Sequence, residues 1–192
     1  MNAPRQHHVR PATPADDAPI QALFESAIAS ARWIPDGAPR DTDFKRNAGG
    51  ESVYVSCADD GRITGLLSVY AGGAFIHHLY VAPACQRQGI GAALLDSMQA
   101  WLPKPWRLKC VVANGSARAF YARLGWIEIE TNVGSQGPYV VLRLGAPTVQ
   151  PAPNSSTAVT TTAAPGQTHT RTAQMAAAAA AAHQRRGKKS RR

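Results

Sequence analysis

The most constraining feature of this sequence is a short apolar strand, a glycine-containing turn and an amphipathic helix, all within residues 79–95. The strand ends at Val81, the turn contains Gly89, and apolar residues recur at helical spacing from Ile90 onward. Such a junction directs free backbone N–H groups and the positive end of a helix dipole to one point, where phosphate binds. Gly89 and Gly91 would let a ligand approach the backbone closely. The segment therefore predicts an α/β domain with a phosphate-binding turn.

Two other phosphate-binding sequences do not fit this turn. A dinucleotide-binding fingerprint needs a third glycine where this chain has Leu94, and a P-loop needs a Gly-Lys-Ser/Thr sequence that the turn lacks. On this stretch alone, a turn that uses its glycines only for packing remains an alternative.

The hydrophobic pattern of residues 1–145 predicts one α/β domain, in which helices pack on a mixed sheet. Strands are expected at residues 8–10, 53–55, 63–70, 75–81, 108–112, 126–130 and 139–144. Helices are expected from an N-cap at Asp16-Asp17 to about Trp33, around residues 43–47, from Ile90 to Leu102 and from Ser116 to Leu124. The turn at Asp59–Arg62 predicts a hairpin in which Gly61 takes a positive φ, and residues 34–50 predict a long loop.

Residues 146–192 differ from the rest of the chain in composition. They contain seven of the 21 Lys and Arg residues and none of the 12 acidic ones, so residues 1–145 carry a net charge of only +2. Pro, Thr, Ser and Ala dominate this segment, which ends in a basic cluster at 183–192. Because it lacks apolar bulk, we expect it to be disordered. The folded domain is not expected to be a basic nucleic-acid binder.

The cysteines and the N-terminal residues indicate the compartment. Cys57, Cys85 and Cys110 match neither a CxxC nor a Cys/His metal spacing, and their odd number favours reduced thiols. Residues 1–10 are polar, and no run of about 18 apolar residues occurs. We therefore expect a cytoplasmic protein with no bound metal and no membrane partner.

Two motifs resemble those of the GNAT family of N-acetyltransferases. The family's acetyl-CoA motif is Gln/Arg-x-x-Gly-x-Gly/Ala after a strand that ends in Val-x-Pro, and residues 86–91 after Val81-Ala82-Pro83 match every position. The second motif, Asn-x-x-Ala-x-x-Phe-Tyr-x-x-x-Gly-Phe, is present at the expected distance as Asn114, Ala117, Phe120, Tyr121, Gly125 and Trp126. The resemblance covers nearly all of residues 1–145.

This resemblance implies a GNAT acyl-CoA N-acyltransferase fold, with a mostly antiparallel mixed sheet, and acetyl-CoA as cosubstrate. Backbone N–H groups of residues 87–92 would hold the diphosphate, and the pantetheine arm would pair with the 79–81 backbone like an extra strand. The residues that the resemblance places at acetyl-CoA are Leu79, Tyr80, Val81, Gln86, Arg87, Gln88, Gly89, Ile90, Gly91, Ala92, Asn114 and Tyr121.

The resemblance also implies catalytic roles. A bulge should separate the 75–81 strand from the 108–112 strand and open a cleft for the thioester, whose carbonyl the backbone N–H of Leu79 would polarise. Tyr121 occupies the family's position for the acid that protonates the departing thiolate, a role open to a phenol with an ordinary pKa near 10. The alternative for Tyr121 is an aromatic packed beside Phe120. Asn114 would cap its helix in either case.

The general base is the least defined part of the predicted site. The family's two glutamate positions fall here on Phe75 and Lys109, neither of which is a carboxylate. His77 shares the strand parity of Phe75 and Leu79 and titrates near neutrality, so it is a candidate base. His78 should point the opposite way unless the bulge shifts the register. Proton transfer to water remains an alternative.

The acceptor pocket should lie between the 32–50 region and the hairpin near residues 137–139. Trp33, Asp36, Asp41 and Asp43 would form a rim that favours a cation, or else a solvated acidic loop. A small amine, a peptide N-terminus and a lysine side chain all stay open as acceptors, as do a monomer and a homodimer. The rival function is an acetyl-CoA-sensing or nucleic-acid-binding protein that uses its basic segment 183–192.

Overall fold

The computed structural model describes residues 7–146, so the segments 1–6 and 147–192, including the basic segment 183–192, lie outside the described residues. Seven strands form one sheet in the order β1-β2-β3-β4-β5-β7-β6. They are β1 (His8–Pro11), β2 (Ser52–Cys57), β3 (Ile63–Tyr70), β4 (Phe75–Val81), β5 (Trp106–Val111), β6 (Ile127–Gly134) and β7 (Gly137–Leu144). All neighbours are antiparallel except β4 and β5, which run parallel. The predicted mixed sheet is confirmed.

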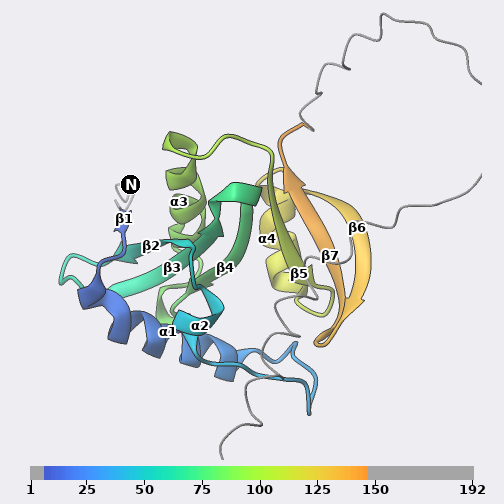
Figure 1. The fold of residues 1–192 in the computed structure, drawn as a ribbon, viewed down its shortest axis with the longest axis horizontal. Coiled ribbons are helices and arrows are strands. Elements are labelled where there is room, and N and C mark those ends of the chain that lie inside the picture. The colour runs from blue at the N-terminus through green and yellow to red at the C-terminus, as the bar shows by residue number, and fades with distance from the viewer. Residues whose placement is uncertain (1–6, 147–192) are drawn as a thin grey trace, which may run out of the picture. The chain divides into compact units, whose positions relative to one another are not determined.

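Helices cover both faces of this sheet. They are α1 (Asp17–Ser30), α2 (Phe44–Asn47), α3 (Ile90–Ser97) and α4 (Gly115–Arg123). The helix α1 contacts β3 and β4, whereas α3 contacts β1 to β4 from the other face (Figure 1). Four short 3-10 turns, at Pro14–Asp16, Ala71–Gly73, Pro83–Cys85 and Met98–Ala100, connect the elements.

Two helices are shorter than the sequence predicted. The helix α1 ends at Ser30 rather than near Trp33, and the Arg40 guanidinium donates to the carbonyl of Ile28 at 3.0 Å. The helix α3 ends at Ser97, whose hydroxyl donates to the Leu94 carbonyl at 2.7 Å, and the chain continues to Ala100 as a 3-10 turn. Side-chain bonds of this kind to the last carbonyls compete with continuation of a helix.

The buried residues form two clusters, one on each face of the sheet. The α1 cluster includes Phe24, Phe44 and Leu66, and the α3 cluster includes Leu94 and Trp106. These side chains remove apolar surface from water on both faces, which is the main favourable contribution to folding.

A glycine in β3 lets α3 lie close to the sheet. A Cβ atom on Gly65 would lie 2.9 Å from Cγ2 of Ile90 and 3.0 Å from Cδ1 of Leu94, closer than carbon atoms pack. Because Ile90 is the first residue of α3, the glycine sets the height of the helix N-terminus above the sheet. The predicted phosphate-binding turn therefore depends on contact with β3.

The start of α1 is fixed by an ion pair rather than by the predicted N-cap. Asp16 stands at the N-cap position but accepts no capping hydrogen bond from the helix. Its carboxylate instead receives two bonds from the Arg10 guanidinium, at 2.7 and 2.9 Å, and two from Thr13. These hydrogen bonds outweigh burial and hold the pKa of Asp16 well below its usual range. The carboxylate thus joins β1 to the start of α1.

A β-bulge interrupts β4 at its two histidines. Ser68 of β3 pairs with His78, but the next residue, Val69, pairs with Ile76, so His77 is an extra residue without a partner. An extra residue reverses the alternation of side chains along a strand. Ile76 and Leu79 accordingly contact the same cluster, on the α3 face.

Strands β4 and β5 pair over a very short length. Only Phe75 with Arg107 and Ile76 with Leu108 are partners, and no residue of β4 after Ile76 pairs with β5. Figure 1 shows the two ribbons separating beyond this point. The backbone edge of residues 77–81 that faces β5 therefore has no strand partner.

Candidate functional site

The N-terminus of α3 has backbone N–H groups without acceptors. Gly89 occupies the N-cap position with φ +89° and supplies no side-chain acceptor. The first paired N–H of the helix is that of Ala93, which donates to the Gly89 carbonyl at 3.0 Å. Within residues 7–146 the N–H groups of residues 90–92 donate to no backbone or side-chain acceptor. This arrangement fits the diphosphate of acetyl-CoA, because it places unpaired donors at the positive end of a helix.

The turn before α3 is tightly constrained. Arg87 has φ +57°, a value that non-glycine residues seldom adopt, and the carbonyl of Gln88 lies 2.5 Å from the His7 Nε2 atom. A Cβ atom on Gly91 would lie 3.2 Å from the Phe120 ring, so α4 packs closely beside the turn. The Gln86 side chain donates to the Val81 carbonyl at 3.3 Å and links the turn to β4.

The second motif forms α4 beside this turn. The Asn114 side chain caps the helix by accepting from the Ala117 N–H at 3.2 Å, as the sequence predicted. Phe120 and Tyr121 follow on the helix, with ring centroids 5.1 Å apart. Gln86, Gln88, Gly91 and Asn114 thus lie on connected elements, although a role for each of them in acetyl-CoA binding stays a prediction.

Tyr121 lies inside the α3 cluster. It is 7% exposed, and its ring centroid lies 5.5 Å from that of Trp126. Burial raises the pKa of its hydroxyl, so this group stays protonated at neutral pH. Among the described residues the hydroxyl makes no hydrogen bond. A phenol that is protonated and makes no hydrogen bond can act as a general acid. The ring also packs beside Phe120, as expected if Tyr121 is only structural.

The structure adds a carboxylate that the sequence did not reveal. Glu51, immediately before β2, is bonded to His77 Nδ1 and to the Ser68 hydroxyl, and only 5% of its side chain is exposed. Burial disfavours its ionised form, but the two hydrogen bonds outweigh burial and lower the pKa of the carboxyl below its ordinary value. Glu51 is therefore an ionised partner for the candidate base.

His77 does not share a face with Leu79, although strand parity predicted that it would, because the bulge at His77 interrupts the alternation of side chains along β4. Leu79 packs on the α3 face, whereas Tyr80 packs in the α1 cluster and His77 contacts the Phe75 ring. His77 and His78 both border one cavity, so the bulge turns two consecutive histidines toward the same space.

That cavity has a volume of about 290 Å³. It is lined by Asn47, Phe75, Ile76, His77, His78 and Lys109. His77 and Lys109 are the first residues after the last paired positions of β4 and β5, so the cavity lies where these strands begin to separate. This position makes it a candidate pocket for the acceptor amine.

The acidic loop residues do not line this cavity. Asp41 and Asp43 both bind the Arg46 guanidinium and lie exposed beside α2. The Gln136 side chain of the β6–β7 turn donates to the Pro39 carbonyl at 3.3 Å, so loop and hairpin meet as predicted. Trp33 is half-buried and Asp36 is exposed, and neither borders the cavity.

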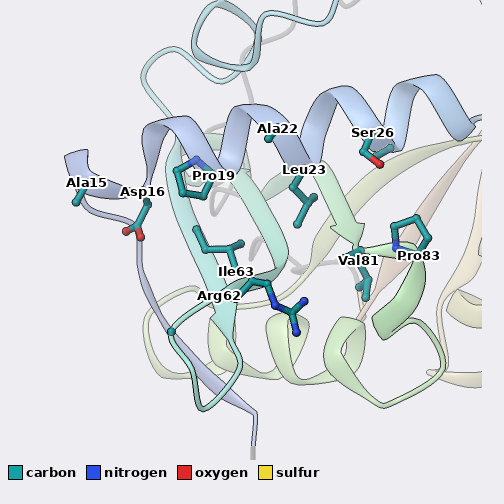
Figure 2. Close-up of a pocket in the computed structure, with 13 residues that line it drawn as sticks. Ala15, Asp16, Pro19, Ala22, Leu23, Ser26, Arg62, Ile63, Val81 and Pro83 are labelled. Atoms are coloured by element: carbon teal, nitrogen blue, oxygen red, sulfur yellow. The ribbon is translucent and has the colours of Figure 1, made fainter.

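A larger cavity, of about 560 Å³, lies between α1 and the end of β4. Figure 2 shows α1 along one wall, with Arg62, Val81 and Pro83 along the other. Its carboxylate, Asp16, is already bound to Arg10. None of the predicted catalytic side chains borders it, so volume alone does not mark the reactive site.

Residues 7–146 offer neither a metal-binding cluster nor a membrane-spanning helix. No group of three His, Cys, Asp or Glu side chains there is arranged to bind a metal ion. None of the helices in this region is long and apolar enough to cross a membrane. Cys57, Cys85 and Cys110 carry free thiols.

Comparison with known proteins identifies the family. The model of the Acetyltransferase (GNAT) family matches residues 20–126, more than half of the chain. The chain belongs to the GNAT acetyltransferase family. The match spans α1 to α4, including the turn at Gly89 and the helix that carries Tyr121. Membership makes this chain an acyltransferase of a family that uses acetyl-CoA. No curated protein matches the sequence significantly.

Solved structures share the fold. The ribosomal-protein-S18-alanine N-acetyltransferase from Escherichia coli is 16% identical, with a TM-score of 0.58, over 76% of this chain and 99% of that one. A GCN5-related N-acetyltransferase from Kribbella flavida is 20% identical, with a TM-score of 0.57, over 75% and 100%. The yncA protein from Salmonella typhimurium, solved with its cofactor acetyl-CoA, is 21% identical, with a TM-score of 0.55, over 76% and 99%.

His78 makes the stability of the fold sensitive to acid. Its ring packs against Phe24, Phe44 and Tyr80, with centroids 5.2 to 6.0 Å away, and its Nδ1 atom is buried without a partner among the described residues. Burial lowers the pKa of His78 to about 4. Between that value and its ordinary pKa near 6.5, the unfolded chain binds a proton that the folded chain does not, so stability falls as pH falls.

We expect His78→Phe to remove this acid sensitivity. The wild type should lose about 2 kcal/mol more of its unfolding free energy between pH 7.5 and pH 5 than the variant does. Urea unfolding at the two pH values measures the difference. The exposed His8 offers a matched control, because His8→Phe should leave the pH dependence as it is in the wild type. Equal losses in wild type and His78→Phe would show that His78 is protonated in the fold.

Proposed function

We propose that this chain transfers the acetyl group of acetyl-CoA to a primary amine by direct attack of the amine on the thioester. The observation that carries the proposal is the unpaired helix N-terminus at residues 90–92, which follows a strand whose β5-facing edge is open from His77 to Val81. The diphosphate of acetyl-CoA would bind at the helix N-terminus, and the extended pantetheine arm would lie along the open edge of β4. Acetyl-CoA supplies the activated acetyl group and the thiolate leaving group.

The backbone of this chain would hold and orient the cosubstrate. The N–H groups of residues 87–92 donate to the diphosphate, and Arg87 adds a positive charge beside it. The exposed edge at Leu79–Val81 donates to the arm in the manner of an added strand. At the end of that arm the N–H of Leu79 polarises the thioester carbonyl, because a donor aimed at a developing oxyanion stabilises the transition state.

The Glu51–His77 pair would act as the general base. An imidazole Nδ1–H that donates to the Glu51 carboxylate leaves Nε2 with its lone pair, ready to accept a proton from the amine. The ionised carboxylate also stabilises the imidazolium that results. The Ser68 hydroxyl donates to the second carboxylate oxygen of Glu51, so the Glu51 carboxylate and the His77 ring have fixed positions. This pair supports a histidine base over proton transfer to water.

Tyr121 would supply the proton for the departing thiolate. The new N–C bond forms as the C–S bond breaks, the amine proton goes to His77, and the phenol proton goes to the sulfur. The raised pKa of Tyr121 keeps this proton in place until the thiolate develops. The products are an N-acetylated amine and CoA.

We expect Gly89→Asp to weaken acetyl-CoA binding by about tenfold or more, equivalent to at least ~1.4 kcal/mol. A side chain at φ +89° strains the turn, and a carboxylate beside the unpaired N–H groups competes with phosphate. Calorimetric titration with acetyl-CoA measures the affinity.

Gly61→Asp is the matched control for this experiment. Gly61 also has a positive φ, +82°, and a Cβ atom there would meet nothing within 4 Å. It lies in the β2–β3 turn, so Gly61→Asp should strain the backbone without changing affinity for acetyl-CoA. A folded Gly89→Asp protein with wild-type affinity would refute the proposed diphosphate site.

We expect Tyr121→Phe to slow acetyl transfer while acetyl-CoA affinity stays nearly unchanged. Only the hydroxyl is lost, the ring still packs against Phe120 and Trp126, and general acid catalysis is typically worth ~10²–10⁴-fold. Single-turnover kinetics across pH measure the chemical step even where product release limits steady-state turnover. Tyr54→Phe, on a ring stacked against Trp101 outside the site, is the control. Wild-type single-turnover rates for Tyr121→Phe would make this residue structural.

A further inference from the structure

A basic side chain lines the candidate acceptor cavity. His77 and Lys109 follow directly after the paired residues Ile76 and Leu108, one on each separating strand, and both line the cavity. An imidazole and an ammonium group therefore border the same space of about 290 Å³. Lys109 is thus a positive neighbour of the candidate base His77, and the proposed proton transfer to His77 does not involve it.

Lys109 is not neutralised by an acid. Its Nζ atom lies 5.0 Å from the centroid of the Tyr139 ring, and it forms no ion pair with any described residue. A cation–π contact leaves the charge of the ammonium intact and its hydrogen-bond donors available. The Lys109 ammonium is thus held in position, but no acid neutralises its charge.

Other cations strengthen the positive character of this sheet face. Arg107 lies two residues before Lys109, and the sheet register places Arg143 directly opposite Arg107, so the three side chains share one face. The Nε atom of Arg143 is buried without a hydrogen-bond partner among the described residues. Val141 of β7 pairs with Lys109 on one side and with Glu130 of β6 on the other. The sheet therefore places one acid, Glu130, on the same face as Lys109.

Three of the carboxylates near this site are bound to other groups, whereas Glu130 is exposed on β6 and does not line the cavity. Glu51 is buried and bonded to His77 and Ser68, and Asp41 and Asp43 bind Arg46. The cavity lining contains Lys109, two histidines and Asn47 but no acid. A polyamine or a lysine-rich peptide would bring further positive charge to an already positive cavity, whereas an anionic group would be attracted.

The cavity also limits the size of the acceptor. Drug-sized ligands occupy clefts of roughly 300–1,000 Å³, so a volume of about 290 Å³ suits a smaller molecule. A compact acceptor with one anionic group matches both size and charge.

We propose that the acceptor is a free α-amino acid whose carboxylate binds the Lys109 ammonium while its amino group faces His77. This inference rests on the proposed acetyl transfer. The reaction forms one amide bond and breaks the thioester, and it yields an N-acetylamino acid and CoA. The positive field of Lys109 also disfavours the protonated amine, which must lose its proton before attack.

A matched acceptor panel tests this assignment. The full-length protein is given acetyl-CoA with the common L-amino acids, their primary amides and the corresponding decarboxylated amines, and release of the CoA thiol is followed. For the best amino acid, kcat/KM should exceed that of its amide and its amine by about tenfold or more, through a lower KM, since the carboxylate contributes to binding.

Lys109→Gln and Lys104→Gln form the matched pair of variants. Lys104 also lies 5.0 Å from an aromatic ring, that of Trp106, but it does not line the cavity. Lys109→Gln should reduce the ratio of amino-acid to amide kcat/KM to near one, and Lys104→Gln should keep the wild-type ratio. Thermal unfolding of both variants checks that they fold.

The outcomes separate the acceptor assignment from the proposed function. If amides or simple amines are acetylated as well as amino acids, or if Lys109→Gln keeps the preference, the assignment is overturned while acetyl transfer stands. If acetyl-CoA binds but no amino acid in the panel is acetylated, the assignment is also overturned. If acetyl-CoA does not bind, the proposed function fails first and the assignment fails with it.

Discussion

The short contact between β4 and β5 determines where everything else in the site lies. Two parallel strands normally satisfy each other's backbone groups along their length. Here the pairing stops at Ile76 and Leu108, and the bulge at His77 follows at once. The sheet therefore stays continuous through its buried centre while one edge of β4 is left without a partner. An unpaired strand edge is a template for another extended backbone.

The bulge has a second effect, on side-chain direction. An extra residue in β4 lets Leu79 pack in the α3 cluster, while His77 and His78 both border the acceptor cavity. The two histidines have different surroundings. His78 is surrounded by aromatic rings and has a lowered pKa, whereas His77 is 43% exposed and bonded to the ionised Glu51. One strand irregularity thus yields a structural and a candidate catalytic histidine.

Local sequence was enough to predict the turn at residues 86–91 and the cap at Asn114, because each depends on residues near one another in the chain. The mixed sheet followed from the order of apolar strands and helices along the chain. Glu51 was missed because its contact with His77 joins the start of β2 to the bulge in β4 through the register of two strand pairs. The predicted hairpin turn at Asp59–Arg62 joins β2 to β3, and in the structure this hairpin pairs Val53 with Ser68. The face of His77 was mispredicted because parity fails at a bulge, and bulges leave no fixed sequence signature.

The proposed base at the β4 bulge is tested most directly by single-turnover acetyl transfer in the wild type and in His77→Gln. Both proteins would be mixed with acetyl-CoA and the fastest acceptor of the panel between about pH 6 and 9, where an imidazole changes its charge. The wild type should form acetylated product from bound acetyl-CoA. The variant should bind acetyl-CoA equally well but react ~10²–10⁴-fold more slowly at neutral pH, with a smaller deficit as rising pH deprotonates the amine without help. Equal rates at every pH would contradict the assignment of His77 as the base.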